Sequence, residues 1–125
     1  MKKKEESFQI AISKYLQVQY PDVYFMSDSS GIRLPMGLAV KAKKQRSKHA
    51  QLDLVILEPR KGFHGLIIEL KKDEGEVFKN DGDFKKSERI ESQNKSIDHL
   101  IKKGYLCRYG FGFDHTKMII ETYLN

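Results

Sequence analysis

The chain has 125 residues, of which 39% are hydrophobic and 32% charged, and its formal net charge at pH 7 is +6. This composition is typical of a soluble globular protein, and the length suits one domain. It excludes a membrane-spanning segment, and the N-terminal residues lack the apolar segment of a signal peptide, so we expect a cytoplasmic protein. The single Cys107 excludes an internal disulfide and a cysteine-rich zinc site, and we expect it in a buried strand.

The first predicted elements are a helix, a short strand and a long loop. Apolar residues at helical spacing predict a helix over residues 4–20, which ends before Pro21. Residues 23–26 are predicted to form a strand. Turn-forming residues make residues 28–50 mostly loop, with room for a short strand at residues 38–40.

Basic residues concentrate near the end of this loop. They are Lys41, Lys43, Lys44, Arg46, Lys48 and His49. Such a cluster is either an ordinary solvated loop or a surface for a polyanion, and phosphodiester backbones are the commonest polyanionic partner. We predict contact with nucleic acid through this loop; further candidate phosphate contacts are Arg33, Lys85 and Lys86.

Two apolar runs at residues 52–57 and 65–71 predict neighbouring strands. Both are short and aliphatic, and the segment between them contains a proline and a glycine, which suit a turn between antiparallel strands. Side chains alternate across a strand, so Glu69 and Lys71 share one face of the second strand. Asp53 of the first strand is then placed opposite Glu69.

Two carboxylates that meet at a half-buried sheet edge repel each other unless a cation joins them. A hard divalent ion with oxygen ligands fits Asp53 and Glu69. The alternative is a structural ion pair between Glu69 and Lys71 at a strand end, with Asp53 as a turn or edge residue.

The remaining elements are an acidic loop, a helix, a strand and a final short helix. Acidic residues at 73–83 form a loop that we interpret as a mobile hairpin or lid. A helix is predicted over residues 87–103, with Gln93 facing the sheet or, alternatively, reaching solvent at the edge of the apolar stripe. Residues 105–109 form a strand, and Asp114 is predicted to cap the last helix. The element order predicts an α/β fold, a mixed sheet with helices packed on it.

Several of these residues together resemble the VRR-NUC family of the PD-(D/E)XK nuclease superfamily. The matching positions are Glu5 to Gln9 in the first helix, Asp53, Glu69-Leu70-Lys71, Gln93 and Gly104-Tyr105. The resemblance covers nearly the whole chain. One departure is Ala50-Gln51-Leu52 before the aspartate, where the family usually has Gly-x-Pro.

The resemblance implies a restriction-endonuclease-like mixed β-sheet core flanked by α-helices, as a single nuclease domain over residues 1–125. It implies a site for Mg²⁺ or Mn²⁺ formed by Asp53, Glu69, the main-chain carbonyl of Leu70 and a helix-one acid, either Glu5 or Glu6. Helical phase favours Glu5. Lys71 would orient the attacking water, and Gln93 would support the site.

The implied activity is metal-dependent DNA endonuclease activity in a bacterial or phage-infected cell. Small members of this kind suggest a homodimer that is selective for branched DNA such as four-way junctions. An endonuclease of simpler specificity is the enzymatic alternative. A catalytically silent DNA-binding or inhibitory module with a nuclease fold is the alternative from another functional class.

Overall fold

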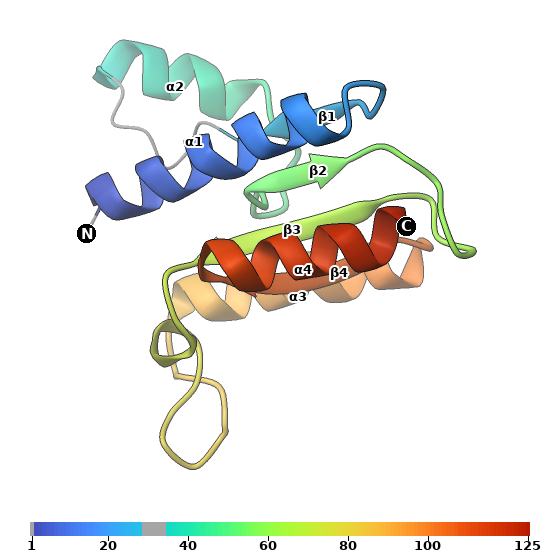
Figure 1. The fold of residues 1–125 in the computed structure, drawn as a ribbon. Helices are drawn as coiled ribbons and strands as arrows, with labels where there is room; N and C mark the ends of the chain where they lie inside the picture. Colours follow the sequence, from blue (N-terminus) through green and yellow to red (C-terminus); the bar gives the residue numbers. More distant parts are fainter. Residues whose placement is uncertain (1, 29–34) are drawn as a thin grey trace.

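A computed structural model describes residues 2–28 and 35–125 of the chain, with side chains of the first helix described from residue 7 onward. Figure 1 shows helices around a central sheet. In chain order the elements are α1 (Lys2–Gln19), β1 (Phe25–Ser27), α2 (Met36–Lys44), β2 (Leu54–Ile56), β3 (Leu66–Lys71), the 3-10 helix η2 (Glu74–Glu76), α3 (Glu88–Lys102), β4 (Leu106–Phe111) and α4 (Gly112–Leu124).

The four strands form one mixed sheet in the order β1-β2-β3-β4. The first three pair antiparallel, and β4 runs parallel to β3. Helices α1 and α4 pack on one face of the sheet and α3 on the other, as Figure 1 shows. The predicted α/β class and mixed sheet are therefore confirmed.

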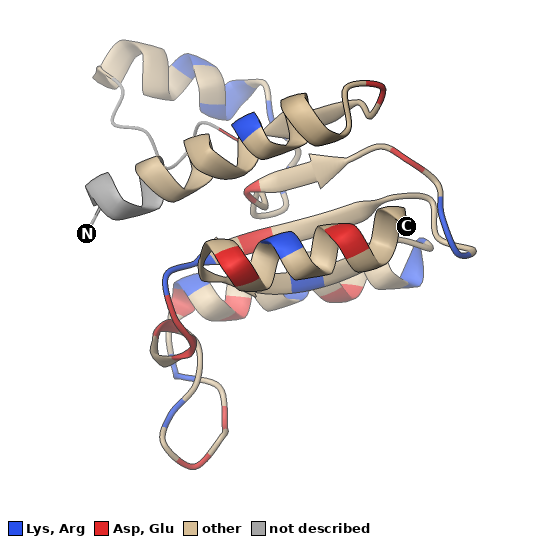
Figure 2. Ribbon diagram, viewed as in Figure 1, with Lys and Arg blue, Asp and Glu red and all other residues tan. Residues whose placement is uncertain are grey.

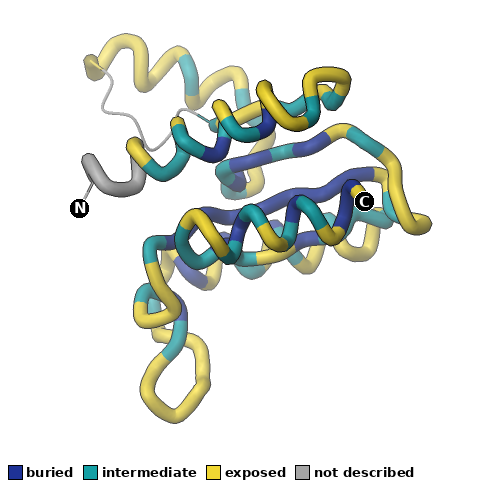
Figure 3. The backbone as a smooth tube through the Cα atoms, viewed as in Figure 1, coloured by how far each residue is buried: buried dark blue, intermediate teal, exposed yellow. Residues whose placement is uncertain are grey.

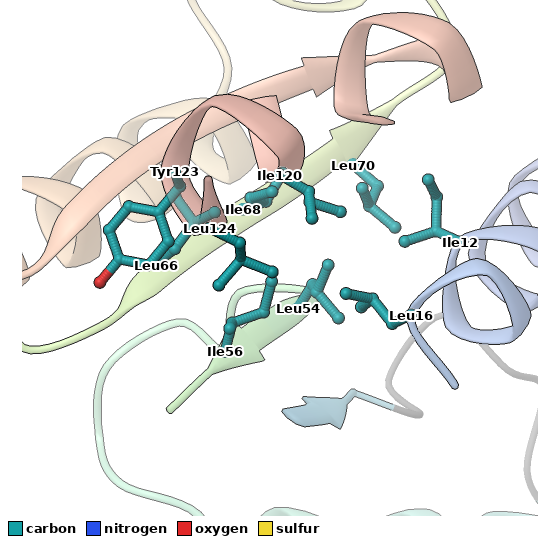
Figure 4. Packing of buried hydrophobic residues seen from close by; sticks show 10 residues of the cluster. All are labelled: Ile12, Leu16, Leu54, Ile56, Leu66, Ile68, Leu70, Ile120, Tyr123 and Leu124. Atoms are coloured by element: carbon teal, nitrogen blue, oxygen red, sulfur yellow. The ribbon is translucent and has the colours of Figure 1, made fainter. Parts of the chain in front are cut away.

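The larger hydrophobic core lies between the sheet and the pair α1 and α4 (Figure 4). Its buried members are Ile12, Leu16, Leu54, Ile56, Leu66, Ile68, Leu70, Ile120, Tyr123 and Leu124. These side chains come from α1, β2, β3 and α4, so burial of their apolar surface holds the four elements together.

A smaller core lies under α3 on the opposite face of the sheet. Its buried residues are Leu52, Ile67 and Cys107, with Ile97 and Leu100 of α3 packed against them. Because side chains alternate along a strand, β3 contributes to both cores, and all six of its residues are buried (Figure 3). The expected burial of Cys107 in a strand is confirmed.

Most predicted elements are present with small shifts at their ends. The first helix and the helix predicted over residues 87–103 are both observed, and Ser87 accepts a hydrogen bond from the Ile90 amide as the N-cap of α3. The strand predicted at residues 23–26 begins later, at Phe25. Among the described residues, no helix has the length and apolar character required to cross a bilayer.

The prediction of loop or strand around residues 38–40 is wrong, because Met36–Lys44 forms helix α2. The segment is rich in good helix formers, it follows Pro35, and its last turn carries three lysines that interact favourably with the helix dipole. None of its nine residues, all described, is buried. It therefore lacks the apolar stripe from which a packed helix is recognised.

The predicted cap of the last helix is also wrong. Helix α4 starts at Gly112, so Phe111 is the N-cap and Asp114 lies inside the first turn. The Phe111 amide donates to Nδ1 of His115 at 2.9 Å, so a side chain of the first turn bonds back to the backbone at the start of the helix. Asp114 still places negative charge at the positive end of the helix.

The acidic segment after β3 forms a hairpin that projects from the sheet, as Figure 1 shows. Phe78 and Phe84 pair across its base, with ring centroids 5.1 Å apart, and Val77 beside them is fully buried. The hairpin is thus fixed to the core at its base, while its tip is exposed (Figure 3).

Candidate active site

Asp53 and Glu69 meet where β2 begins and β3 ends. Leu54 pairs with Ile68, so the same antiparallel register places Asp53 opposite Glu69, as predicted. The Asp53 amide donates to Glu69 Oε1 at 3.2 Å, and the Leu70 amide donates to Asp53 Oδ2 at 2.9 Å. These reciprocal bonds hold both carboxylates against the neighbouring strand.

Lys71 and Gln93 complete the predicted group around Glu69. Lys71 Nζ lies 3.6 Å from Glu69 Oε2, and Gln93 of α3 donates from Nε2 to the same oxygen at 2.8 Å. Gln93 is buried and faces the sheet, so the predicted orientation is confirmed and the solvent-facing alternative is wrong. The four side chains come from the residue just before β2, from β3 and from α3, and the fold brings them together.

Burial dominates the electrostatics of the two carboxyl groups. Desolvation raises the pKa of Asp53 above its ordinary value, although the Leu70 amide and the Lys71 ammonium oppose the shift. The pKa of Glu69 is raised further, first by desolvation and then by the charge of Asp53. The ammonium of Lys71 therefore only partly compensates for two carboxylates in one buried site.

Gln93 also presents an acceptor that lacks a partner. Its Oε1 is buried, and no described residue donates to it. Flipping the side-chain amide of Gln93 would place its oxygen, instead of its NH₂ group, against the Glu69 carboxylate oxygen. Two acceptors would then face each other, so the observed orientation is the favourable one. A buried, unsatisfied carbonyl oxygen costs free energy unless a ligand or water reaches it.

A cleft of about 220 Å³ opens beside this group. It is lined by Arg46, Ala50, Gln51, Asp53, Glu69, Arg89, Ser92 and Gln93. Arg89 and Ser92 are not among the predicted site residues. Arg89 lies four residues before Gln93 and so shares its helix face, and Ser92 directly precedes Gln93. This spacing alone does not distinguish them from the other exposed residues of α3.

Helix α1 is attached directly beside the site through Gln9. Its Nε2 donates to Ser27 Oγ at 2.7 Å, to the Asp28 carbonyl at 2.8 Å and, more weakly, to the Asp53 carbonyl at 3.5 Å. Both candidate helix-one acids, Glu5 and Glu6, precede Gln9 in α1, but their side chains lie outside the described residues.

The described donor set suits a hard divalent cation. Two convergent carboxylates and the unpartnered Gln93 oxygen are all oxygen donors, which Mg²⁺ and Mn²⁺ prefer. No cluster of three or more His, Cys, Asp or Glu side chains able to hold a metal occurs among the described residues. A third carboxylate ligand would thus have to come from a side chain outside those that the structure describes.

The predicted nucleic-acid contacts fall into three groups. Arg46 lines the cleft and pairs with Asp28, with Nη2 3.5 Å from Oδ1. Lys41, Lys43, Lys44 and Lys48 are exposed on α2 and the segment after it, where Figure 2 shows positive charge. Lys85 and Lys86 are exposed between the hairpin and α3 and do not line the cleft, and Arg33 lies outside the described residues.

Comparison with known proteins finds similarity among solved structures. No family model and no curated protein matches the chain. A solved structure described as a "VRR_NUC domain protein" is similar, with a TM-score of 0.68 and 26% sequence identity, covering 96% of this chain and 87% of that one. The chain has the VRR-NUC fold.

The VRR-NUC fold is a nuclease-type, restriction-endonuclease-like arrangement of a mixed sheet flanked by helices. The likeness extends over almost all of the chain. The predicted resemblance, made from residues scattered along the sequence, is confirmed at the level of the fold.

Proposed function

We propose that the protein is a divalent-metal-dependent DNA endonuclease that hydrolyses phosphodiester bonds. The observation that carries the proposal is the convergence of Asp53, Glu69 and Gln93 in the lining of one cleft, with Lys71 paired to Glu69. A silent relative has no chemical need for two repelling carboxylates in a buried site. The nuclease-type fold supplies independent support.

In the proposed site, Asp53, Glu69 and the Leu70 carbonyl would hold Mg²⁺ or Mn²⁺, with Glu5 or Glu6 as a further ligand. Such an ion polarises the scissile phosphate and lowers the pKa of a bound water. Helix α1 is bonded to the strand ends beside Asp53 through Gln9, which supports a ligand from its first turns.

Lys71 is the proposed positioning group for the attacking water. It is buried, so its ammonium acts in a low-dielectric site, where it would stabilise the negative charge that develops on the phosphate. Attack of water on phosphorus would break the bond to the 3′-oxygen, leaving a 5′-phosphate and a 3′-hydroxyl. Gln93 would hold the Glu69 carboxylate in place through its 2.8 Å hydrogen bond.

Arg46 and Arg89 are the proposed phosphate contacts inside the cleft. Both line it together with the two carboxylates, and a guanidinium can donate two hydrogen bonds to one phosphate. The exposed lysines of α2 extend this positive surface away from the cleft (Figure 2). These lysines would contribute DNA-binding affinity that does not depend on the base sequence of the DNA.

We further propose that the protein forms a homodimer that cuts branched DNA, such as four-way junctions, with one cut in each of two paired strands. Two sites related by a twofold axis would cut symmetrically, and C₂ is the commonest oligomer symmetry. The exposed apolar side chains of α2 support an interface with a second copy.

The test is cleavage of labelled duplex, single-stranded, flap and four-way junction DNA in Mg²⁺, in Mn²⁺ and in EDTA. The native chain should cut only with metal. Glu69→Ala and Lys71→Ala should each lose at least about a hundredfold in rate, since each removes a group that acts on the transition state. Glu91→Ala and Lys79→Ala, which remove exposed residues of the same types, should cut normally.

Two results would contradict this proposal. One is cutting that continues in EDTA or in Glu69→Ala, which would exclude the metal role of the buried carboxylates. The other is DNA binding without cutting in any metal, which would favour a catalytically silent module. Comparison of rates among the four substrates then tests the branch selectivity separately.

A further inference from the structure

A second cavity, of about 310 Å³, lies directly beside the cleft on the α3 face of the sheet. Its lining comes from the sheet, from α3 and from the segment that follows α2, and includes His49, Ala50, Gln51, Val55, Ile67 and His99. The cavity is at the small end of the range for ligand sites, about 300–1,000 Å³, which suits one flat heterocycle.

The two hollows share a wall. Ala50 and Gln51 line both the cleft and the second cavity. The Ser96 hydroxyl donates to the Ala50 carbonyl at 2.8 Å, so this wall is fixed to α3. A ligand with one group in the cleft can therefore place an adjacent group in the cavity.

The lining of the second cavity differs from that of the cleft. Leu52, Val55 and Ile67 provide an apolar floor, whereas arginines and carboxylates line the cleft. At the second cavity, the rings of His49 and His99 are stacked, with centroids 4.3 Å apart and 20° between their planes, although both residues are exposed. Flat exposed rings beside an apolar floor provide a stacking surface for another aromatic ring.

One segment links the charged and the aromatic sites. Between α2 and β2, Arg46 lines the cleft and His49 lines the cavity. A nucleotide has the matching arrangement, a phosphate beside a flat base. We propose that the second cavity receives an unpaired nucleobase next to the phosphate bound in the cleft.

This inference rests on the proposed function and narrows its substrate class. A base enters the cavity only after leaving its stack, which is easiest in single strands, flaps and junctions. The enzyme would thus prefer DNA in which a base beside the scissile phosphate is unpaired. Stacking does not depend on base identity, so the preference is for structure rather than sequence.

The experiment compares binding of a single-stranded thymidine oligonucleotide with an abasic oligonucleotide of equal length and charge, in EDTA, by fluorescence anisotropy. The native chain should bind the thymidine strand about tenfold more tightly, in line with the stacking of one base. His99→Ala should reduce that ratio, and Val55→Phe, which fills the cavity from its floor, should bring it close to one. Affinity for the abasic strand should stay unchanged.

Met118→Ala and Met118→Phe are the matched controls, because Met118 is exposed on α4, across the sheet from the cavity. Both should keep the native ratio. Circular dichroism checks the fold of each variant, and the exposed position of His99 gives a variant that leaves the core intact.

Because the assay needs no cutting, its outcome is independent of the catalytic test. The nucleobase site is overturned if the native chain binds the thymidine and abasic strands equally well, or if neither cavity variant changes the ratio of the two affinities. Either result would hold even if the protein is a nuclease. A ratio that depends on the cavity supports the site even if no cutting is found. Failure to bind either strand overturns the nucleobase site, while the cleavage assay alone decides the proposed endonuclease activity.

Discussion

The close approach of the Asp53 and Glu69 carboxyl groups in a buried site is electrostatically unfavourable. Both carboxyl groups have raised pKa values, mainly because burial disfavours their charged forms, and Glu69 is also repelled by Asp53. Their backbone and side-chain hydrogen bonds fix them in this position. Sites that place function above stability commonly show this kind of local conflict.

We predict that Asp53→Asn stabilises the metal-free protein by about 0.5–2 kcal/mol. Asparagine can still accept the hydrogen bond from the Leu70 amide through its carbonyl oxygen, and it removes one of two like charges. Thermal unfolding in EDTA measures the effect. Added Mg²⁺ should raise the melting temperature of the native chain and leave that of the variant nearly unchanged.

The pH dependence of this effect has a defined sign. A carboxyl group whose pKa is raised by folding favours the folded state while it is protonated, and that contribution is lost as pH rises from the ordinary value through the raised one. The advantage of Asp53→Asn should therefore grow as pH rises above about 4. Asp98→Asn, on the exposed side of α3, is the control. A difference in stability between Asp53→Asn and the native chain that becomes smaller with rising pH would contradict the raised pKa of Asp53.

Arg89 is predicted to bind one substrate phosphate. Arg89→Ala should weaken DNA binding and reduce the slope of log affinity against log salt by about one, because one phosphate contact is lost. Titrations at several salt concentrations measure both quantities. Arg108→Ala, which removes an exposed arginine from β4 outside the cleft, should have a smaller effect on the slope; equal effects would rule out a specific contact by Arg89.

The sequence was sufficient to predict the central group of the site, because each member follows from a local pattern. Two apolar runs with a turn between them specify antiparallel neighbours, and alternation then fixes the faces of Glu69 and Lys71. The apolar stripe of α3 orients Gln93. Arg89 was missed because an exposed arginine on a helix has no pattern of its own; only the packing of α3 against the sheet places it in the cleft.

Among the helices, those that pack on the sheet were predicted from the sequence, and α2, which buries none of its described residues, was not. Helices α1 and α3 bury apolar faces, whereas α2 buries none of its described residues, so its sequence carries only weak intrinsic propensity. The parallel pairing of β3 with β4 was not predicted either. It depends on α3 crossing over one face of the sheet, which is a tertiary arrangement.

The contact between β4 and α4 depends on the absence of a side chain at Gly110. A Cβ there would overlap Thr116 Oγ1 and lie 3.0 Å from Ile68 Cγ2, and both neighbours are buried. Gly110→Ala should therefore destabilise the protein by about 1–3 kcal/mol, measured by denaturant unfolding. Gly37→Ala in α2 meets open space and improves helix propensity, so it should cause no loss of stability; unchanged stability in Gly110→Ala would show that α4 can shift.

The molecule as a whole separates its charged and apolar surfaces. Positive charge gathers on the later part of α2 and in the segment after it (Figure 2), while Met36, Leu38 and Val40 of the same helix leave apolar side chains exposed. A helix that packs on no core and still carries exposed aliphatic residues is a reasonable surface for self-association. This arrangement would place the lysines of α2 beside the proposed dimer interface.

We predict a homodimer whose interface includes α2. Leu38→Glu should weaken dimerisation at least about tenfold, because a carboxylate would be buried without a partner in the interface. Sedimentation velocity across a range of protein concentrations measures the effect. The variant monomer should keep its melting temperature, because Leu38 is exposed in the single chain and supports no core.

The same variant tests whether the dimer matters for branched substrates. A twofold pair of sites cuts both strands of a junction within one complex, whereas a monomer must bind twice. Leu38→Glu should therefore cut one strand of a four-way junction and release nicked intermediate, while Met118→Glu, at a similarly exposed apolar residue of α4, should behave as the native chain. A native chain that remains monomeric at tens of micromolar, or a dimer that Leu38→Glu leaves intact, would exclude α2 as the interface, and the paired cuts would then require another explanation.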